Sequence, residues 1–324
     1  MLKQFSKTIL PLLLLLLLFV QTPAQSWITV RSESRFNFSG MALVEQTDAR
    51  KTFIVVHDNK DQFANALQKA KIERAALLIV ENSESRPRIE PLKWFDKDGK
   101  ENALPVDLES VSAIPDQPNK FLAGVGNPNE AGEKGRVYYI ELAADKKSVR
   151  VLNWFKLPTQ TDGRDFEAFA VQKIGDKLFA FWADRGKNEK PATLFWGEID
   201  LQKGEIKSLG ETNIKTPDLL DLTKYPKAEL RSISDLKIDD SGGVFVTSAL
   251  DGEDYGIFAS AFYYVGAFAA NGATVSFKAS RFPVKLYQFK NYKTEAFEFI
   301  EGENGGVIFV TDDEDFGASI FFNW

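Results

Sequence analysis

The chain has no cysteine, a single histidine and two methionines among its 324 residues. The lack of cysteine excludes disulfides, thiol nucleophiles and thiolate metal sites, so burial of apolar groups must hold the fold together. The single histidine, His57, excludes a zinc site built from several imidazoles. Basic residues are outnumbered, because 40 Lys and Arg stand against 46 Asp and Glu, a formal net charge of −6. An acidic chain without a basic stripe argues against nucleic acid and against anionic membrane surfaces as partners.

Long apolar runs are rare, and the longest lies close to the N-terminus. It covers residues 9–20, follows a basic segment and precedes Thr22 and Ala24, the small residues of a cleavage site. Such a run is too short to span a bilayer. We therefore expect residues 1–24 to be a signal peptide. Residues 25–324 are expected to be exported to the periplasm or the cell exterior, without a transmembrane span.

Aromatic residues are abundant, with 27 Phe, 8 Tyr and 6 Trp. They occur in short apolar runs that are separated by turns rich in Gly, Asp and Asn. Runs of this length with such turns are typical of β-strands and hairpins. The composition therefore predicts an all-β fold.

A six-residue pattern recurs along the chain, with a small third residue and an apolar fourth residue. A turn and a second apolar run follow each copy, and successive copies start 58 to 70 residues apart. That spacing leaves room for four strands in each unit. The copies are FSGMAL (38–43), LESVSA (108–113), FEAFAV (166–171), LRSISD (230–235) and TEAFEF (294–299).

These repeats predict a β-propeller with four-stranded antiparallel blades. The last unit has only three strands, and WITVRSES (residues 27–34) can supply the fourth and close the ring. Five blades use all of residues 25–324 as one domain. Two alternatives remain: a sixth, degenerate blade within residues 58–106, or a β-sandwich whose repeats are coincidental.

The repeat also brings charged residues to equivalent positions. In an antiparallel hairpin, the start of the first strand and the end of the second lie at the same edge. We therefore expect one mouth of the central channel to collect side chains from scattered parts of the sequence. Those that begin first strands are Glu109, Glu167, Arg231 and Glu295. Those that follow second strands are His57, Asp58, Asp184, Arg185, Asp251, Asp254, Asp312, Asp313 and Asp315.

Carboxylates that converge on a narrow axis repel one another, and a bound cation relieves this repulsion. Clusters of carboxylate oxygens suit Ca²⁺, which takes about six to eight oxygen ligands. Calcium is therefore the one candidate cofactor. The alternative is that these acids are solvated residues of turns.

Five residues have candidate roles in catalysis or ligand binding. His57 and Asp184 are the candidate catalytic residues, with His57 as a general base. Arg185, Arg231 and Glu109 are the candidate ligand-binding residues, because guanidinium groups hold phosphate or carboxylate through paired hydrogen bonds. The alternative for the histidine is a polar loop residue, and for the arginines it is neutralisation of acidic neighbours.

Two segments, DFEAFAV…FWADRG (165–186) and TEAFEFI…FVTDDEDFG (294–317), resemble a group of exported propellers. The group comprises the phytase-like esterase domain proteins and the broader set of calcium-dependent phosphotriesterase, gluconolactonase and SdiA-regulated propellers. The resemblance implies a propeller fold with calcium in the channel. For some members it also implies hydrolysis of esters, lactones or phosphoesters.

Carried over residue by residue, the resemblance makes Glu167 and Glu295 metal ligands, with Asp184 and Asp313 as their neighbours. Together with Asp312 and Asp313, the two glutamates are the candidate metal ligands of this sequence. Arg231 stands where the pattern has another Glu, and Ser39 replaces the first one. These departures remove two ligands from an acidic cage.

Two functions therefore remain open. The preferred one is a propeller that binds a small molecule or a protein at an acidic channel mouth. The alternative is a metal-dependent esterase, lactonase or phosphoesterase that acts at the same mouth. Whether the protein is an enzyme is left undecided.

Overall fold

A computed structural model describes most of the chain after the N-terminal segment. In this part the backbone forms strands and turns, and no helix is long and apolar enough to cross a membrane. The predicted signal peptide lies outside the described residues, as do Asp254 and Asp315. The described residues are 27–30, 38–58, 73–101, 105, 107–126, 135–158, 164–220, 224, 227–252, 257–271, 274–302, 305–313 and 317–323.

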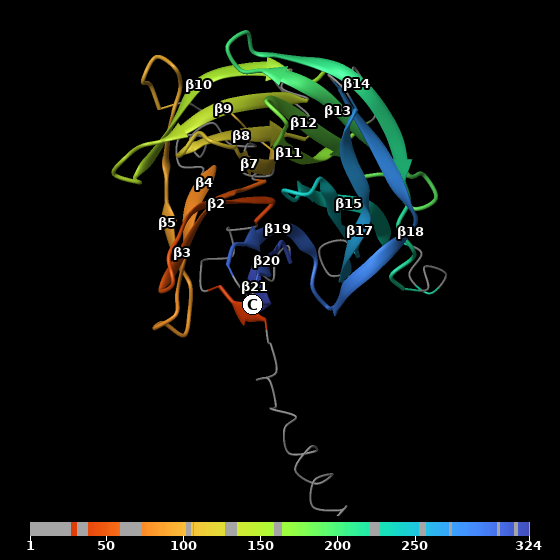
Figure 1. The fold of residues 1–324 in the computed structure, drawn as a ribbon. Helices are drawn as coiled ribbons and strands as arrows, with labels where there is room; N and C mark the ends of the chain where they lie inside the picture. The colour runs from red at the N-terminus through yellow and green to blue at the C-terminus, as the bar shows by residue number, and fades with distance from the viewer. Residues whose placement is uncertain are drawn as a thin grey trace, which may run out of the picture.

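Five sheets surround a common axis, so the protein is a five-bladed β-propeller, as the repeats predict (Figure 1). Blade 1 consists of β2 (Gly40–Gln46), β3 (Arg50–Val56), β4 (Ala75–Glu81) and β5 (Arg88–Pro91). Blade 2 consists of β7 (Leu108–Ala113), β8 (Lys120–Val125), β9 (Arg136–Leu142) and β10 (Ser148–Lys156), with the short β6 (Lys93–Phe95) parallel to β10.

The remaining three blades complete the ring. Blade 3 consists of β11 (Phe166–Ile174), β12 (Lys177–Asp184), β13 (Ala192–Asp200) and β14 (Glu205–Ile214). Blade 4 consists of β15 (Glu229–Ile238), β16 (Gly243–Asp251), β17 (Ala259–Asn271) and β18 (Thr274–Lys290). Blade 5 consists of β19 (Thr294–Ile300), β20 (Gly306–Thr311), β21 (Ser319–Asn323) and β1 (Ile28–Thr29).

The last blade is completed from the other end of the chain, as the sequence predicts. Strand β1 pairs antiparallel with β21, with Ile28 opposite Ile320 and Thr29 opposite Ser319. The amide of Val30 continues the pairing by donating to the carbonyl of Ala318 at 2.9 Å. This shared blade closes the ring because β19 contacts β2 beside the axis.

Apolar side chains fill the spaces between neighbouring blades. Among the described residues, one buried cluster lies at each of the five blade interfaces. The cluster between blades 4 and 5 is aromatic, and its Phe262 and Phe297 rings meet edge to face at 4.8 Å. The core is therefore distributed around the axis, which explains how a chain without disulfides holds the ring together.

The innermost strands approach one another closely, which explains the small third residue of the repeat. A Cβ added to Gly40 would lie 2.7 Å from the Cα of Ser110 on the neighbouring inner strand. Lys237 of β15 lies further along the axis and is 5% exposed. Its ammonium donates to the carbonyls of Met41 (2.6 Å) and Val111 (3.0 Å), which joins blades 4, 1 and 2.

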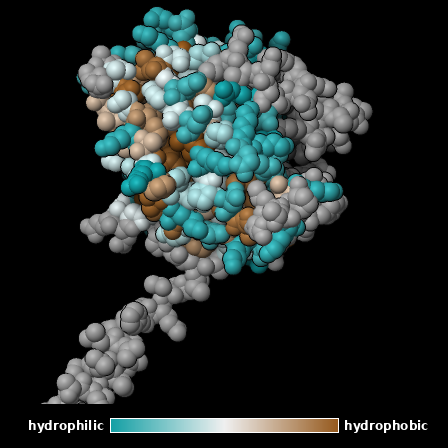
Figure 2. Space-filling view, turned by 90° about the vertical axis from the view of Figure 1, so that its right-hand side faces the viewer, coloured by the Kyte–Doolittle hydropathy of each residue, from teal (hydrophilic) through white to brown (hydrophobic). Residues whose placement is uncertain are grey.

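The outermost strand of blade 4 lies on the side of the molecule that faces the viewer in Figure 2. On that side, apolar residues are exposed between hydrophilic ones (Figure 2). The two long strands β17 and β18 form this edge of the ring (Figure 1).

Candidate functional site at the mouth of the channel

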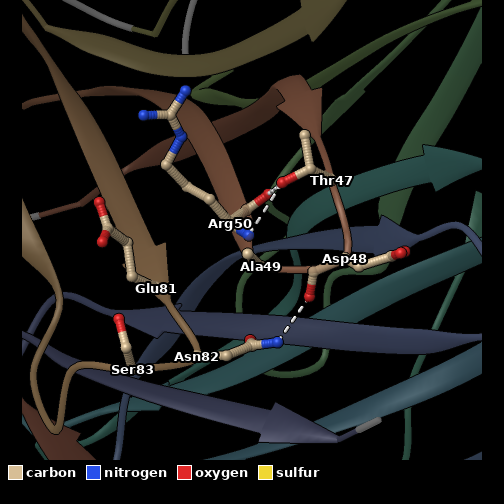
Figure 3. Close-up of a pocket in the computed structure, with 7 residues that line it drawn as sticks. All are labelled: Thr47, Asp48, Ala49, Arg50, Glu81, Asn82 and Ser83. Carbon is tan, nitrogen blue, oxygen red and sulfur yellow. Dashed lines mark hydrogen bonds between the residues drawn. The ribbon is translucent and has the colours of Figure 1, made fainter.

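The propeller has two faces, and each is a candidate for the functional site. One of them carries the β2–β3 turn. A hollow of about 580 Å³ lies there between the turn and the end of β4 (Figure 3). Its polar groups build the turn itself: the Arg50 amide donates to Thr47 Oγ1 at 3.0 Å, and Asn82 Nδ2 donates to the Asp48 carbonyl at 2.6 Å. Because these polar groups bond within the turn, we interpret the hollow as part of the turn structure rather than as a binding site.

The opposite end collects the repeated glutamates, because each one occupies a β-bulge. The register of the inner hairpin shifts at Glu109 in blade 2, at Glu167 in blade 3 and at Glu295 in blade 5. A bulge inserts an extra residue into the strand and re-aims its side chain. The three side chains are only 7%, 3% and 4% exposed. Equivalent bulges thus bring three glutamates to the same mouth.

Arg231 occupies the corresponding position in blade 4 and joins three blades. Its Nη1 lies 3.1 Å from Glu295 Oε1 and 4.0 Å from Glu167 Oε2, and its Nη2 lies 2.6 Å from Asp251 Oδ2. Burial alone would lower the pKa of Arg231, but the carboxylates of Glu295, Glu167 and Asp251 raise it well above its usual value. Arg231 stands where blades 2, 3 and 5 have a glutamate, and it therefore places a permanently charged cation among the acids.

Lys293 is a second buried cation of the mouth, and the sequence reasoning missed it. It lies just before β19 and is 1% exposed, with its ammonium 3.5 Å from Glu295 Oε1 and 3.7 Å from Asp312 Oδ2. Burial would lower its pKa, but these two carboxylates raise it above the usual value. Its position two residues before the repeated glutamate is the signal that could have identified it.

Asp313 lies beside this group and supports the backbone. Its carboxylate accepts from the Lys293 amide at 2.9 Å and from Thr311 Oγ1 at 2.7 Å. Burial raises the pKa of Asp313 to about 6, although both hydrogen bonds oppose the shift. Asp313 is therefore a carboxyl group that titrates close to neutral pH at the mouth.

Arg185 provides the cation of blade 3. Its guanidinium lies 3.0 Å from Asp165, 3.4 Å from Glu167 and 3.2 Å from Glu229. The neighbouring Asp184 is 3% exposed. Its Oδ1 accepts from the Thr193 amide at 2.9 Å and the Gly186 amide at 3.2 Å, and its Oδ2 accepts from Arg164 at 2.5 Å. Arg185 thus joins blades 3 and 4 at the mouth, whereas Asp184 holds together segments of blade 3.

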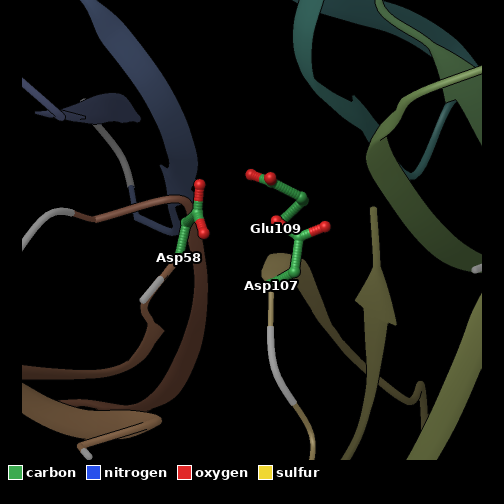
Figure 4. A group of neighbouring side chains, drawn as sticks. All are labelled: Asp58, Asp107 and Glu109. Carbon is green, nitrogen blue, oxygen red and sulfur yellow. The ribbon is translucent and has the colours of Figure 1, made fainter. Parts of the chain in front are cut away.

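A different arrangement occurs where blades 1 and 2 meet. Asp58 follows β3, whereas Asp107 and Glu109 begin β7, and oxygens of the three carboxylates all lie within 4.8 Å of one another. Figure 4 shows Asp58 facing the other two side chains. Asp107 is 1% exposed and holds a left-handed backbone conformation with φ of 60°. We call Asp58, Asp107 and Glu109 the acidic triad.

Glycine at the end of β8 makes room for the triad. A Cβ added to Gly126 would lie 2.6 Å from Glu109 Cγ and 3.1 Å from Asp107 Oδ2. On the other side, Ser39 Oγ accepts from the Asp58 amide at 3.0 Å. The serine that replaces glutamate in the first repeat therefore positions the third member of the triad.

His57 is buried beside the triad. It is 1% exposed, its ring centroid lies 5.8 Å from that of Phe38, and its amide donates to the Arg74 carbonyl at 3.1 Å. Arg74 is itself buried, and its Nε donates to the Pro105 carbonyl at 2.8 Å. The only histidine thus lies in the wall of the mouth, next to Asp58.

The structure divides the predicted site residues into two sets. Three of the four predicted metal ligands, Glu167, Glu295 and Asp312, contact Arg231, Arg185 or Lys293, and the fourth, Asp313, accepts from the Lys293 amide. The second set is the acidic triad. The sequence placed its Asp58 and Glu109 at this mouth and named Glu109 as a ligand-binding residue. Asp107 was missed, although it precedes Glu109 as Asp165 precedes Glu167.

Comparisons with known proteins give a likeness of fold. No family model and no curated protein sequence matches the chain. An α-L-arabinofuranosidase from Lactobacillus brevis aligns with a TM-score of 0.48 and 13% identity over 87% of this chain and 89% of that chain. An endo-arabinase from Bacteroides thetaiotaomicron aligns with a TM-score of 0.47 and 7% identity over 92% and 98%.

A β-fructofuranosidase from Bombyx mori, in complex with sucrose, aligns with a TM-score of 0.45 and 12% identity. The alignment covers 89% of this chain but only 61% of that one. The propeller implied by the sequence resemblance is confirmed by the five blades. Membership of the phytase-like esterase group is not supported by these comparisons.

Proposed function

We propose that this protein is a ligand-binding propeller whose channel mouth holds a divalent cation, Ca²⁺ in the first place, on the acidic triad. The observation that carries the proposal is the approach of three carboxylates from two blades to within 4.8 Å of one another. Two of the three side chains, Asp107 and Glu109, are less than a tenth exposed. Carboxylates in such proximity repel one another unless a cation lies between them.

The repeated positions of the blades support this assignment. In blade 3, the Arg185 amide donates to the Asp165 carbonyl at 3.0 Å, and in blade 2 the Gly126 amide donates to the Asp107 carbonyl at the same distance. Arg185 and Gly126 are thus equivalent. Blade 3 places a guanidinium against its acid pair, whereas blade 2 has no side chain there and receives Asp58 from blade 1.

Oxygen ligands of this kind favour Ca²⁺, whose coordination of about six to eight oxygens tolerates irregular geometry. The triad would supply part of that shell. The remaining positions would stay open to water or to an oxygen of the bound ligand, which gives the mouth a direct means of recognising hydroxyl, carboxylate or phosphate groups. Export through the predicted signal peptide would expose the site to extracellular calcium, for which binding modules have Kd values on the order of 10⁻⁴ to 10⁻³ M.

Calorimetric titration with Ca²⁺ and with Mg²⁺ tests the proposal, alongside the Tm with and without each ion. We expect one calcium site in the wild type, and its loss in Asp107→Asn and in Glu109→Gln. The matched control is the equivalent pair of blade 3, Asp165→Asn and Glu167→Gln, which should retain calcium binding. The proposal fails if the folded wild type binds no calcium, or if both pairs of variants lose it equally.

Hydrolysis at the same mouth is the second candidate function. Asp313 favours it, because a carboxyl group with a pKa near 6 can hold or release a proton at neutral pH. A panel of ester, lactone and phosphoester substrates, assayed with and without calcium, tests this candidate. Turnover that is lost in both Asp313→Asn and Asp107→Asn would support it. If calcium binds and no substrate is turned over, the binding function stands alone.

A further inference from the structure

The outer edge of blade 4 carries a projecting bulge that the channel mouth does not involve. Tyr264 of β17 pairs with Val284 of β18, and Gly266 pairs with Ala279. Residues 280–283 therefore stand opposite the single residue Val265. Because β18 is the outermost strand of its sheet, the extra residues lie at the outer edge of the ring (Figure 1).

Large apolar side chains are exposed on and beside this bulge. Phe282 is 69% exposed, Val284 48% and Leu286 44%. The Arg281 guanidinium lies 5.4 Å from the centre of the Phe282 ring. We call Arg281, Phe282, Val284, Lys285 and Leu286 the β18 patch. Figure 2 shows the side of the molecule on which it lies.

The charge of this region is opposite to that of the whole protein. Residues 259–290 contain no Asp or Glu, in a chain that has 46 of them. The same stretch contains four basic residues, all exposed on β18: Lys278, Arg281, Lys285 and Lys290. A positive strip beside exposed apolar side chains is complementary to a surface that is both anionic and apolar.

Pairing with another strand does not suit this edge. The bulge interrupts the ladder, Pro283 has no amide hydrogen to donate, and lysines along an edge strand oppose edge-to-edge pairing. A second copy of β18 would also bring like charges together. The β18 patch therefore offers side chains, rather than backbone groups, to whatever covers it.

We propose that the β18 patch docks on a lipid surface with anionic headgroups. Phe282 and Leu286 enter the boundary between headgroups and acyl chains, and Arg281 and Lys285 remain at the headgroups. The bulge makes this contact available, because it carries Phe282 at the outer edge of the ring with 69% of the residue exposed. The ligand-binding mouth, built from the ends of the inner strands, stays independent of the contact.

Co-sedimentation with lipid vesicles tests the proposal directly. The wild type should bind phosphatidylcholine vesicles that contain phosphatidylglycerol, bind vesicles of phosphatidylcholine alone far less, and lose affinity as salt rises. Arg281→Glu/Lys285→Glu should lower partitioning by at least about 25-fold, since each basic residue contributes about fivefold and each new glutamate adds repulsion from the anionic headgroups. Phe282→Ser/Leu286→Ser should lower it by about tenfold.

The matched charge control is Lys147→Glu/Lys156→Glu, two exposed lysines of blade 2. It changes the net charge equally and should leave partitioning within about twofold of the wild type. The Tm of each variant confirms that it folds.

The absence of cysteine allows a second, direct readout. A polarity-sensitive fluorophore on Phe282→Cys should shift to shorter wavelength on anionic vesicles, whereas the same label on Trp154→Cys, on β10, should not. The proposal is overturned if the folded wild type binds neither type of vesicle, an outcome that would favour an acidic protein partner. It is also overturned if the control variant loses as much binding as the patch variant.

Discussion

Blades 2 and 3 build the same backbone at the channel mouth and use it in different ways. Each begins with an acid, an apolar residue and a bulged glutamate, and each ties the first acid to the end of the next strand by one backbone hydrogen bond of 3.0 Å. Blade 3 then adds Arg185, which contacts both of its acids. Blade 2 has Gly126 instead, and receives Asp58 from blade 1.

The other blades extend the comparison. Blade 4 carries Arg231 at the repeat position of these glutamates, in contact with Asp251, and in blade 5 Lys293 contacts both Glu295 and Asp312. Three blades thus place cation and anion within the same repeated set of positions. One backbone framework can thus hold its acids with a guanidinium of the same blade, as in blade 3, or bring a third carboxylate to them, as in blade 2, according to the side chain at one position.

The largest expected effect comes from removing the cation that joins three blades. Arg231→Met should destabilise the protein by about 3–5 kcal/mol, because it removes a contact from the buried Glu295 and the part-buried Asp251 and leaves them Lys293 as a neighbouring cation. Chemical denaturation measures the loss. Arg150→Met is the control, since its pair with Glu141 is exposed and should contribute less than about 1 kcal/mol. Equal losses of stability in both variants would show that the ion pairs of the mouth contribute no more than an exposed ion pair.

Exchanging the side chains that distinguish blades 2 and 3 should exchange their properties. Arg185→Gly should cost about 1–3 kcal/mol of stability by removing contacts to Asp165 and Glu167, and added calcium should restore part of it. Gly126→Arg should abolish calcium binding, because a guanidinium takes the place of the ion. Calorimetry and denaturation with and without calcium measure both effects.

A smaller substitution at the same position keeps the test informative if Gly126→Arg fails to fold. Gly126→Ala adds only the Cβ that would lie 2.6 Å from Glu109 Cγ, so it should weaken calcium binding without removing it. If Gly126→Arg folds and binds calcium as the wild type does, glycine at this position has no part in the site.

The pH dependence of stability probes blade 5. Burial raises the pKa of Asp313 to about 6, so the folded state binds its proton more tightly than the unfolded chain does. Its contribution is therefore fully present below pH ~4 and is lost as pH rises to about 6, by at most about 1.4 kcal/mol per pH unit. Asp313→Asn should remove this slope in denaturation curves measured from pH 4 to 8. An unchanged slope would assign it to another group.

The smallest expected effect concerns the serine of the first repeat. Ser39→Ala removes the hydrogen bond to the Asp58 amide and should weaken calcium binding about three- to tenfold, the equivalent of about 0.5–1.5 kcal/mol. The wild-type affinity in Ser39→Ala would show that Asp58 is positioned by other contacts.

Much of the architecture could be predicted from the sequence because the repeat is local. The spacing of FEAFAV and its relatives favoured five blades over six, and the three strands of the last unit indicated that residues near the N-terminus complete it. Strand direction then predicted that Glu109, Glu167 and Glu295 share one mouth. These inferences depend only on alternation, turns and hairpin geometry, which a short stretch of sequence carries.

The identity of each charge partner was decided by the tertiary structure. Arg231 and Glu295 are 64 residues apart, and Asp58 meets Asp107 from the neighbouring blade. A repeat shows which positions are equivalent, but the space left by Gly126 exists only where the next inner strand approaches. Sequence by itself therefore determined the ring and the acidic mouth. Contacts between blades decided which carboxylates lie beside a guanidinium or ammonium group of the protein. They also decided where three carboxylates meet. Both depend on distances between side chains, which strand patterns do not encode.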